Sequence, residues 1–164
     1  MEHFDVTHAP LEGVHLVEAN AGTGKTFNIS SLVVRLIAEG ALDLKNILVL
    51  TFTEAATTEL RARIQHRCRE VLELFESENE AEATEKTEEN NFLVYCKTRY
   101  EQDPEAQKCL QEAVTTFDEA NISTIHGFCQ GLLRSYPFQF DVRPDFELVP
   151  NPSLFILDVI REFW

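Results

Sequence analysis

The sequence predicts an α/β fold in which helices flank a parallel sheet. Three observations support this prediction. Short apolar runs at residues 14–18 and 47–53 have the pattern of buried strands. Each run is followed by a segment with apolar residues at three- and four-residue spacing, which is typical of an amphipathic helix. A glycine-rich loop joins the first run to its helix, as in sheets whose strands alternate with helices.

The composition limits the classes of protein that the chain can belong to. It has 164 residues, 44% hydrophobic and 26% charged, as in a soluble domain with its own core. The net charge of -14 excludes a protein that coats nucleic acid by overall positive charge, so any DNA contact must come from a local patch. The four cysteines form no C-x-x-C pair, which favours a reduced, cytoplasmic protein. No apolar run approaches the ~18 residues of a membrane span, and we expect no membrane partner.

The first half of the chain shows the elements in order. A helix is expected over residues 26–39, because Gly40 stands where a helix would stop. The strand at 47–53 is apolar at consecutive positions, as expected of a strand covered on both faces. The helix that follows, over residues 56–75, has one apolar stripe. Its other faces carry a cationic cluster, Arg61, Arg63, Arg67 and Arg69.

The middle of the chain is strongly acidic. Residues 76–120 hold thirteen acidic and four basic residues, a balance of -9 out of the total of -14. The segment 77–91 has little to bury and predicts a solvated linker or a frayed helix end. Residues 92–114 are expected to be helical, with Asp103-Pro104 as an interruption. We therefore expect an acidic helical insert over residues 76–120.

The last part of the chain returns to the sheet and then leaves it. A third short strand is expected at 121–126, followed by a helix over 128–136. After several prolines, Ser153 opens an apolar segment that predicts a helix. A helix ending in Phe-Trp would expose a large apolar surface, so we expect the polypeptide to be an incomplete fragment of something longer. The expected organisation is a P-loop core (1–75), the acidic insert (76–120), a strand and helix of the same core (121–136) and the start of an inserted helical subdomain (137–164).

The glycine-rich loop predicts a phosphate site. It fits the pattern G-x-x-x-x-G-K-[ST], except that alanine stands at the first glycine position. Its two glycines let backbone N–H groups approach phosphate oxygens closely. Lys25 would reach the β and γ phosphates of ATP, and the Thr26 hydroxyl would bind Mg2+, so these two are the candidate catalytic residues. The candidate phosphate-binding set is Ala19, Asn20, Ala21, Gly22, Thr23, Gly24, Lys25 and Thr26.

A P-loop ATPase also needs an acidic residue at the end of another buried strand, to hold Mg2+ and orient water. Asp118 and Glu119 follow a segment too polar for a central strand, and we expect a turn there. Asp158 follows an apolar run whose pattern is helical. The sequence therefore predicts nucleotide binding without the second half of the catalytic machinery.

Three blocks of the sequence together resemble a known family. They are residues 19–26 with Gly-Lys-Thr, residues 51–64 with Thr-Phe-Thr-Glu-Ala-Ala, and residues 123–130 with Ser-Thr-Ile-His-Gly-Phe-Cys-Gln. They resemble motifs I, Ia and Ib of superfamily 1 DNA helicases of the UvrD/Rep type, in particular the RecB-type beta subunits of exodeoxyribonuclease V. The resemblance implies a RecA-like P-loop NTPase fold and an ATP-dependent 3' to 5' helicase and exonuclease. It also implies partners, namely single-stranded and duplex-end DNA and the other subunits of a heterotrimeric complex that acts in double-strand break repair and recombination.

The resemblance also implies a DNA-binding set, Thr51, Phe52, Thr53, Arg63, Thr124 and His126. Threonine hydroxyls suit phosphates, and Phe52 could support a base by stacking. Each assignment has a structural alternative. Phe52 could be a core residue and His126 a buried histidine with its hydrogen bonds satisfied. The arginines could form a solvated helix face paired with glutamates, the interpretation preferred for Arg67 and Arg69.

Two other functions remain open on the sequence. A small P-loop nucleotide kinase fits the length, but it should carry an arginine-rich lid where this chain is acidic. A non-catalytic module could instead bind a protein partner through the acidic insert and the apolar end. If the helicase interpretation holds, we expect this chain alone to lack ATP hydrolysis and unwinding.

Overall fold

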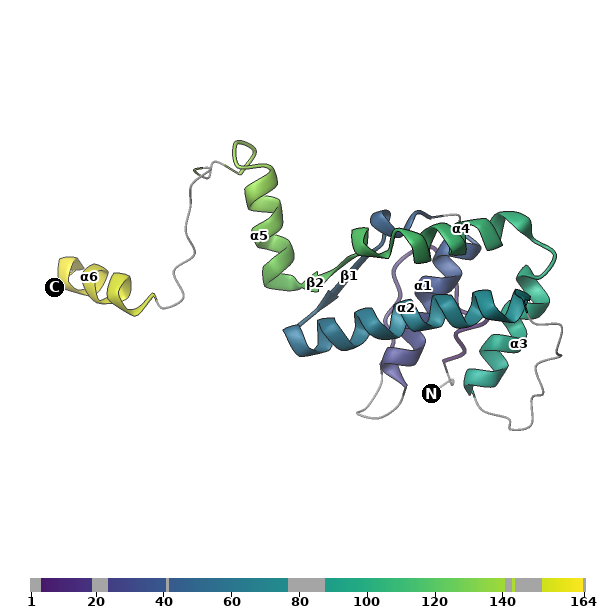
Figure 1. Cartoon of the computed structure of the whole chain (residues 1–164). Helices are drawn as coiled ribbons and strands as arrows, with labels where there is room; N and C mark the ends of the chain where they lie inside the picture. Colours follow the sequence, from purple (N-terminus) through teal and green to yellow (C-terminus); the bar gives the residue numbers. More distant parts are fainter. Residues whose placement is uncertain are drawn as a thin grey trace. The chain divides into compact units, whose positions relative to one another are not determined.

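A computed structural model describes residues 4–18, 24–40, 42–76, 88–140, 143 and 152–163. By its internal contacts the chain divides into two units, Met1–Ile125 and His126–Trp164. The first unit holds the sheet and the hydrophobic core (Figure 1). Its elements are α1 (Lys25–Ala38), η1 (Leu44–Asn46), β1 (Leu48–Thr51), α2 (Glu54–Glu76), α3 (Glu88–Tyr100), α4 (Pro104–Thr115), η2 (Phe117–Glu119) and β2 (Asn121–Thr124). The helices α5 (Ile125–Ser135) and α6 (Ser153–Phe163) follow.

The sheet of the described residues has two parallel strands. Leu48 of β1 pairs with Asn121 of β2, and Thr51 pairs with Thr124. This confirms a strand within each of the predicted ranges, 47–53 and 121–126. The last two residues of the second range are not strand, because α5 begins at Ile125. Parallel strands need a crossover connection, and here α2, α3 and α4 form it (Figure 1). Because the strands are parallel, the residues after Thr51 and after Thr124 leave the sheet at the same edge.

The helices follow the predicted spacing closely. The expected helix over 26–39 is α1, and the expected helix over 56–75 is α2. The interruption expected at Asp103-Pro104 separates α3 from α4. Asp103 is the N-cap of α4, since its carboxylate accepts hydrogen bonds from the backbone N–H of Glu105 and Ala106, both at 3.1 Å. Pro104 follows at the first helical position, where its missing N–H costs nothing.

One hydrophobic core joins all four helices of the first unit. Fully buried side chains come from each of them, with Ile37 on α1, Ile64 on α2, Phe92 on α3 and Leu110 on α4. The ring of Phe27 on α1 meets that of Phe92 edge-on, with 6.2 Å between ring centroids. The helices within the predicted acidic insert thus share the core of α1 and α2. The segment 77–87 lies outside the described residues, so its predicted linker character is not assessed.

The strand expected at residues 14–18 is absent from the described structure, and that prediction was wrong for this chain. The segment has no regular secondary structure, and Val14 and Leu16 are 101% and 85% exposed. An apolar run becomes a strand only where a neighbouring strand satisfies its backbone N–H and C=O groups. The ladder of described residues consists of β1 and β2 alone, and the segment pairs with neither.

The acidic residues that the sequence analysis considered as possible Mg2+ ligands lie outside the sheet. Asp118 and Glu119 belong to the short turn η2, and Asp158 to α6. The predicted turn and the predicted helix are thus both confirmed. Among the described residues, no helix is long and apolar enough to cross a membrane.

Candidate nucleotide and nucleic-acid site

The phosphate loop meets α1 at Gly24. This residue has φ 75°, in the left-handed region where a side chain is strained, and glycine is the residue that adopts it most readily. Its carbonyl accepts the first bond of the helix, from the N–H of Asn28 at 2.9 Å. Lys25 and Thr26 therefore stand in the first turn, with Lys25 exposed and Thr26 partly buried. The remaining loop candidates, Ala19, Asn20, Ala21, Gly22 and Thr23, lie outside the described residues.

The first turn of α1 carries the chemical groups that could bind a nucleoside triphosphate with Mg2+. A helix of 14 residues carries positive partial charge at its N-terminus, where its first N–H groups lack partners inside the helix. An exposed ammonium and a hydroxyl join those groups in the same turn. The described residues contain no cluster of three or more histidine, cysteine or acidic side chains that could hold a metal by themselves. Mg2+ is commonly bound through one or two protein oxygens together with substrate phosphates.

The end of β1 is joined to the start of α2 by a threonine network. Thr53 caps α2, since its hydroxyl accepts a hydrogen bond from the N–H of Ala56 at 3.1 Å. The hydroxyls of Thr51 and Thr57 are hydrogen-bonded to each other at 2.5 Å, and the oxygen of each lies 3.1 Å from the Thr53 carbonyl oxygen, to which the hydroxyl left with a free proton donates. These bonds fix the turn between strand and helix, and they leave Phe52 pointing outward with 80% of its surface exposed. The core alternative for Phe52 was therefore wrong.

Thr124, the last residue of β2, is hydrogen-bonded to the first residue of α2, the helix that follows β1. Its hydroxyl donates to the Glu54 carboxylate at 3.1 Å, and its side chain is buried. Because Thr51 pairs with Thr124, the structure brings Thr51, Phe52, Thr53 and Thr124 together at the carboxyl edge of the sheet. His126 lies in the first turn of α5 and is exposed, so the alternative of a buried histidine was wrong.

The arginines of α2 have separate surroundings. Arg61 donates to the carbonyls of Ala120 and Ile122, at 3.1 and 3.2 Å, and so ties α2 to the strand β2. Arg67 is buried and binds Glu70 at 2.7 Å and Glu89 at 2.6 Å. The predicted pairing of Arg67 with a glutamate is thereby confirmed, but the predicted solvated position is wrong, because Arg67 is buried.

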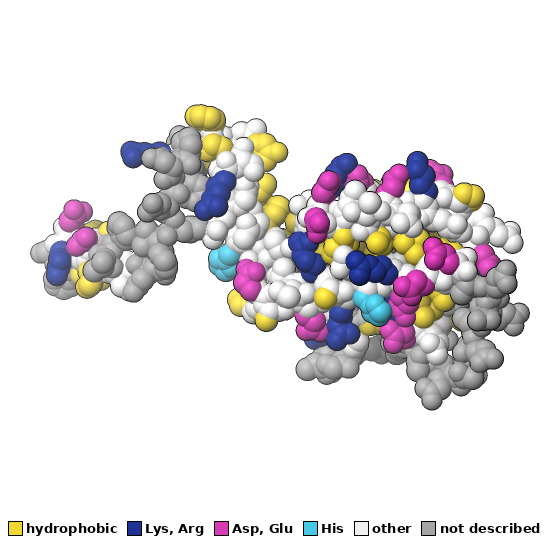
Figure 2. Space-filling view, in the orientation of Figure 1, with side chains coloured by type: hydrophobic (Ala, Val, Ile, Leu, Met, Phe, Trp, Pro, Cys, Tyr) yellow, Lys and Arg dark blue, Asp and Glu magenta, His cyan; other side chains and the backbone are white. Residues whose placement is uncertain are grey.

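Arg63 is exposed, and its partner Glu59 at 3.0 Å is exposed as well. It also lines a hollow of about 260 Å³ together with Phe27, His66 and Arg67. The Arg67 guanidinium lies 5.0 Å from the centre of the Phe27 ring. On the face of the first unit seen in Figure 2, Lys and Arg side chains lie among Asp and Glu side chains.

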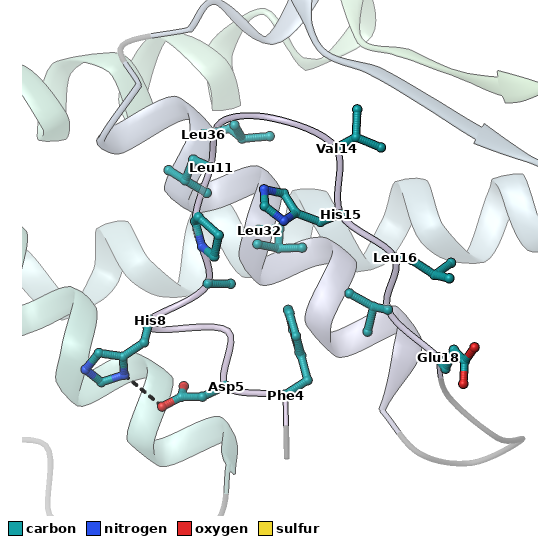
Figure 3. A pocket seen from close by; sticks show the side chains of 13 residues that line it. Phe4, Asp5, His8, Leu11, Val14, His15, Leu16, Glu18, Leu32 and Leu36 are labelled. Carbon is teal, nitrogen blue, oxygen red and sulfur yellow. Dashed lines mark hydrogen bonds and ion pairs between the residues drawn. The ribbon is translucent and has the colours of Figure 1, made fainter. Parts of the chain in front are cut away.

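A wider hollow beside α1 was not found by sequence reasoning. It has a volume of about 940 Å³ and lies between the N-terminal segment and the helix (Figure 3). Phe4, Leu11 and Leu16 line it from the segment, and Leu32 and Leu36 from α1. The helical spacing of Leu32 and Leu36 indicated a covered face of α1, but not that the chain before Gly13 would fold back along it.

The structure thus has a parallel sheet, a Gly-Lys-Thr turn at the start of α1 and a capped turn after β1. The class of protein is that of helicase N-terminal domains. The chain belongs to the family described as UvrD/REP helicase N-terminal domain, whose model matches residues 2–157. It is similar to the RecBCD enzyme subunit RecB of Escherichia coli strain K12, with 33% identity over 99% of this chain and 14% of that protein. The same-named subunit of Chlamydia trachomatis is 36% identical over 99% of this chain and 16% of its own length. That of Haemophilus influenzae is 33% identical over 94% and 13%. The chain thus spans 13–16% of the length of these relatives.

Proposed function

We propose that the chain is the N-terminal ATP-binding portion of an ATP-dependent 3' to 5' DNA helicase and exonuclease subunit. Its activity would serve double-strand break repair and homologous recombination in the cytoplasm. Membership of the UvrD/REP family and similarity to RecB subunits support the proposal. The structural observation that carries it is the first turn of α1, where Gly24 turns the chain and Lys25 and Thr26 follow. The domain division given above and a RecA-like sheet form part of the same proposal.

In this proposal Lys25 binds the β and γ phosphates of ATP, and the Thr26 hydroxyl is a ligand of Mg2+. The backbone of residues 19–24 surrounds the phosphate oxygens. We expect the isolated chain to bind ATP without hydrolysing it. Among the described residues, neither of the two strands ends in an acidic side chain that could hold the metal and orient water.

Single-stranded DNA would bind along the carboxyl edge of the sheet. Phe52 is exposed there and can stack on a base, while the turn at Thr51 and Thr53 offers backbone and hydroxyl groups to phosphates. Arg63 supplies positive charge on α2, and Thr124 supports the edge through Glu54. His126, in the first turn of α5, is proposed as a DNA contact of the second unit. The partners proposed for the whole protein are duplex-end DNA and the other subunits of a heterotrimeric exodeoxyribonuclease V.

Nucleotide binding is tested by Lys25→Ala. Removing the ammonium should weaken binding of a fluorescent ATP analogue in the presence of Mg2+ by at least about tenfold, because a charged contact to phosphate is lost. Lys45→Ala is the matched control. It removes the same charge from an exposed lysine of η1 that pairs with Asp43 at 2.5 Å. Equal affinity of the Lys25→Ala variant and the unsubstituted chain would contradict the assignment.

DNA binding is tested by Arg63→Ala, measured as fluorescence anisotropy of a labelled single-stranded oligonucleotide at several salt concentrations. Loss of one phosphate contact should weaken binding and reduce the slope of log K against log salt by about one. Arg69→Ala is the control, since Arg69 is an exposed arginine of the same helix. If both variants lost the same affinity, bulk charge rather than a contact at Arg63 would be responsible.

A further inference from the structure

One side of α2 carries three polar side chains that all bond to the sheet. They are Glu54, Thr57 and Arg61, at positions i, i+3 and i+7 of the helix. This spacing covers about two turns and places the three side chains in one row. Thr57 is buried and Arg61 is half-buried. We call these three residues the polar row.

The polar row bonds to the last residue of each strand. The Thr57 hydroxyl is hydrogen-bonded at 2.5 Å to that of Thr51, where β1 ends. The Glu54 carboxylate accepts a hydrogen bond at 3.1 Å from the hydroxyl of Thr124, where β2 ends. The first turn of α2 therefore holds both strands at the carboxyl edge of the sheet.

Arg61 attaches β2 to α2 at a second point. Its Nη2 donates to the carbonyls of Ala120 and Ile122, at 3.1 and 3.2 Å. The helix rises about 10.5 Å from Glu54 to Arg61. The strand rises about 10 Å from residue 121 to Thr124. Because the two distances match, α2 bonds to β2 at two points, which fix both the position and the direction of the strand.

These attachments determine where Phe52 lies. Phe52 follows Thr51 directly and is 80% exposed, so packing of its own ring does not hold it in place. Thr51 pairs with Thr124, and the turn that carries Phe52 leaves the sheet at that pair. Hydrogen bonds weaken steeply when they are bent, so those of the polar row resist small displacements of the strands. A ring that stacks on a base needs such a defined position.

We infer that the polar row positions Phe52 for stacking on a DNA base, with Arg61 as a positioning residue that does not contact phosphate. The inference rests on the proposed function, because it needs single-stranded DNA at the carboxyl edge of the sheet. Arg61 bonds to backbone carbonyls of β2, whereas Arg63 is exposed together with its partner Glu59. Arg61 and Arg63 are two positions apart and so lie on nearly opposite sides of α2. Two neighbouring arginines thus serve the same DNA site in different ways.

The test compares three substitutions on α2, Arg61→Met, Arg63→Met and Arg69→Met. Methionine keeps a long unbranched side chain but carries no charge and donates no hydrogen bond. Each full chain is titrated into a single-stranded oligonucleotide containing 2-aminopurine, a base whose fluorescence reports stacking. Phe52→Leu defines the part of the fluorescence change at saturation that depends on Phe52.

Arg61→Met should weaken binding about fivefold or more, the order of magnitude that one stacked base contributes. At saturation it should lose most of the Phe52-dependent fluorescence change, while the slope of log K against log salt stays that of the unsubstituted chain. Arg63→Met should reduce this slope by about one and keep the fluorescence change. Arg69→Met is the control on an exposed arginine of the same helix and should alter neither.

Two results with Arg61→Met would overturn the inference although binding is weakened. A slope reduced by about one would identify a phosphate contact. A full fluorescence change at saturation would mean that Arg61 only stabilises the fold, since a smaller folded fraction does not alter the bound complex. If Arg61→Met matches the unsubstituted chain in both measurements, the inference is rejected and the DNA site stands. If the unsubstituted chain binds no DNA, the proposed DNA site and the inference both fail.

A second pair of variants keeps the test decisive if Arg61→Met does not fold by circular dichroism. Thr57→Val removes the hydroxyl that bonds to Thr51 with little change in volume, and it should also reduce the Phe52-dependent fluorescence change. Thr58→Val is the matched control, because Thr58 is exposed and its hydroxyl donates to a carbonyl within α2. Equal fluorescence changes in the two variants would reject the inference.

Discussion

At the scale of single residues, Glu39 is the most heavily bonded carboxylate described in the first unit. Burial opposes its ionisation, but the hydrogen bonds from Arg35, Tyr100 and Tyr95 outweigh burial and lower the pKa of its carboxyl from 4.5 to about 2. The same pairing raises the pKa of the Arg35 guanidinium. Burial, together with the bond to Glu39, raises the pKa of the Tyr100 hydroxyl. All three groups therefore keep one protonation state over the neutral range.

This pairing predicts a pH dependence of stability. A carboxyl whose pKa is lower in the folded than in the unfolded chain stabilises the fold above the unfolded value, and that contribution disappears as the pH falls toward the folded value. For Glu39 the loss should run from 4.5 down to about 2. We expect the free energy of unfolding of the unsubstituted chain to exceed that of Glu39→Gln by a constant amount near neutral pH. The difference should shrink below 4.5.

Urea unfolding of both proteins between neutral and acidic pH measures this difference. The acidic residues they share titrate alike in both, so their effects cancel in the comparison. A difference that stayed constant down to the most acidic samples would mean that Glu39 is not the group responsible.

Some residues of the candidate site could be predicted from the sequence, and others could not. The place of Lys25 and Thr26 in the first turn of α1 was predictable because the loop pattern is local, whereas their role at a phosphate stays a prediction. Thr51, Phe52, Thr53 and Arg63 were named through a resemblance, and the threonine network shows a structural use for two of them. Arg35 was missed. Its partners at Val6, Ala9, Tyr95 and Tyr100 are distant in sequence, and an arginine in an amphipathic helix is ordinarily a solvated residue.

At the scale of elements, α4 depends on its N-cap. Asp103→Ala removes the carboxylate that accepts hydrogen bonds from the N–H groups of Glu105 and Ala106. The free energy of unfolding should fall by about 1 kcal/mol, the usual cost of losing an aspartate cap. Chemical denaturation measures the change, and Gln102→Ala, one residue earlier and exposed, is the control. A similar loss in the control would show that the turn, and not the cap, accounts for the effect.

Helices were easier to predict than strands for a physical reason. The backbone hydrogen bonds of α1, α2 and α4 are made within each helix. The apolar face of such a helix needs only some other apolar surface to cover it. A strand needs a partner at a definite register. Strands within residues 47–53 and 121–126 pair with each other. Residues 14–18 have an equally apolar pattern but pair with neither strand. Apolar pattern alone could not distinguish these outcomes.

At the scale of the whole molecule, the charge is unevenly distributed. The -14 net charge arises mainly within residues 76–120. Of the arginines of α2, Arg63 and Arg69 are exposed, and Arg63 is the proposed cationic contact to DNA. The apolar segment that opens at Ser153 forms the predicted helix, α6. Its apolar side chains are largely exposed, with Val159 at 63% and Phe163 at 88%.

The parallel pairing of β1 with β2 also constrains the order in which the chain can fold during synthesis. Leu48 pairs with Asn121, and three helices lie between the two strands. On the ribosome, the hydrogen bonds of β1 must wait until the residues of β2 have been made and have emerged, while α1 and α2 can already pack together. The sheet can therefore form only after about three-quarters of the chain has been made, because its second strand ends at Thr124.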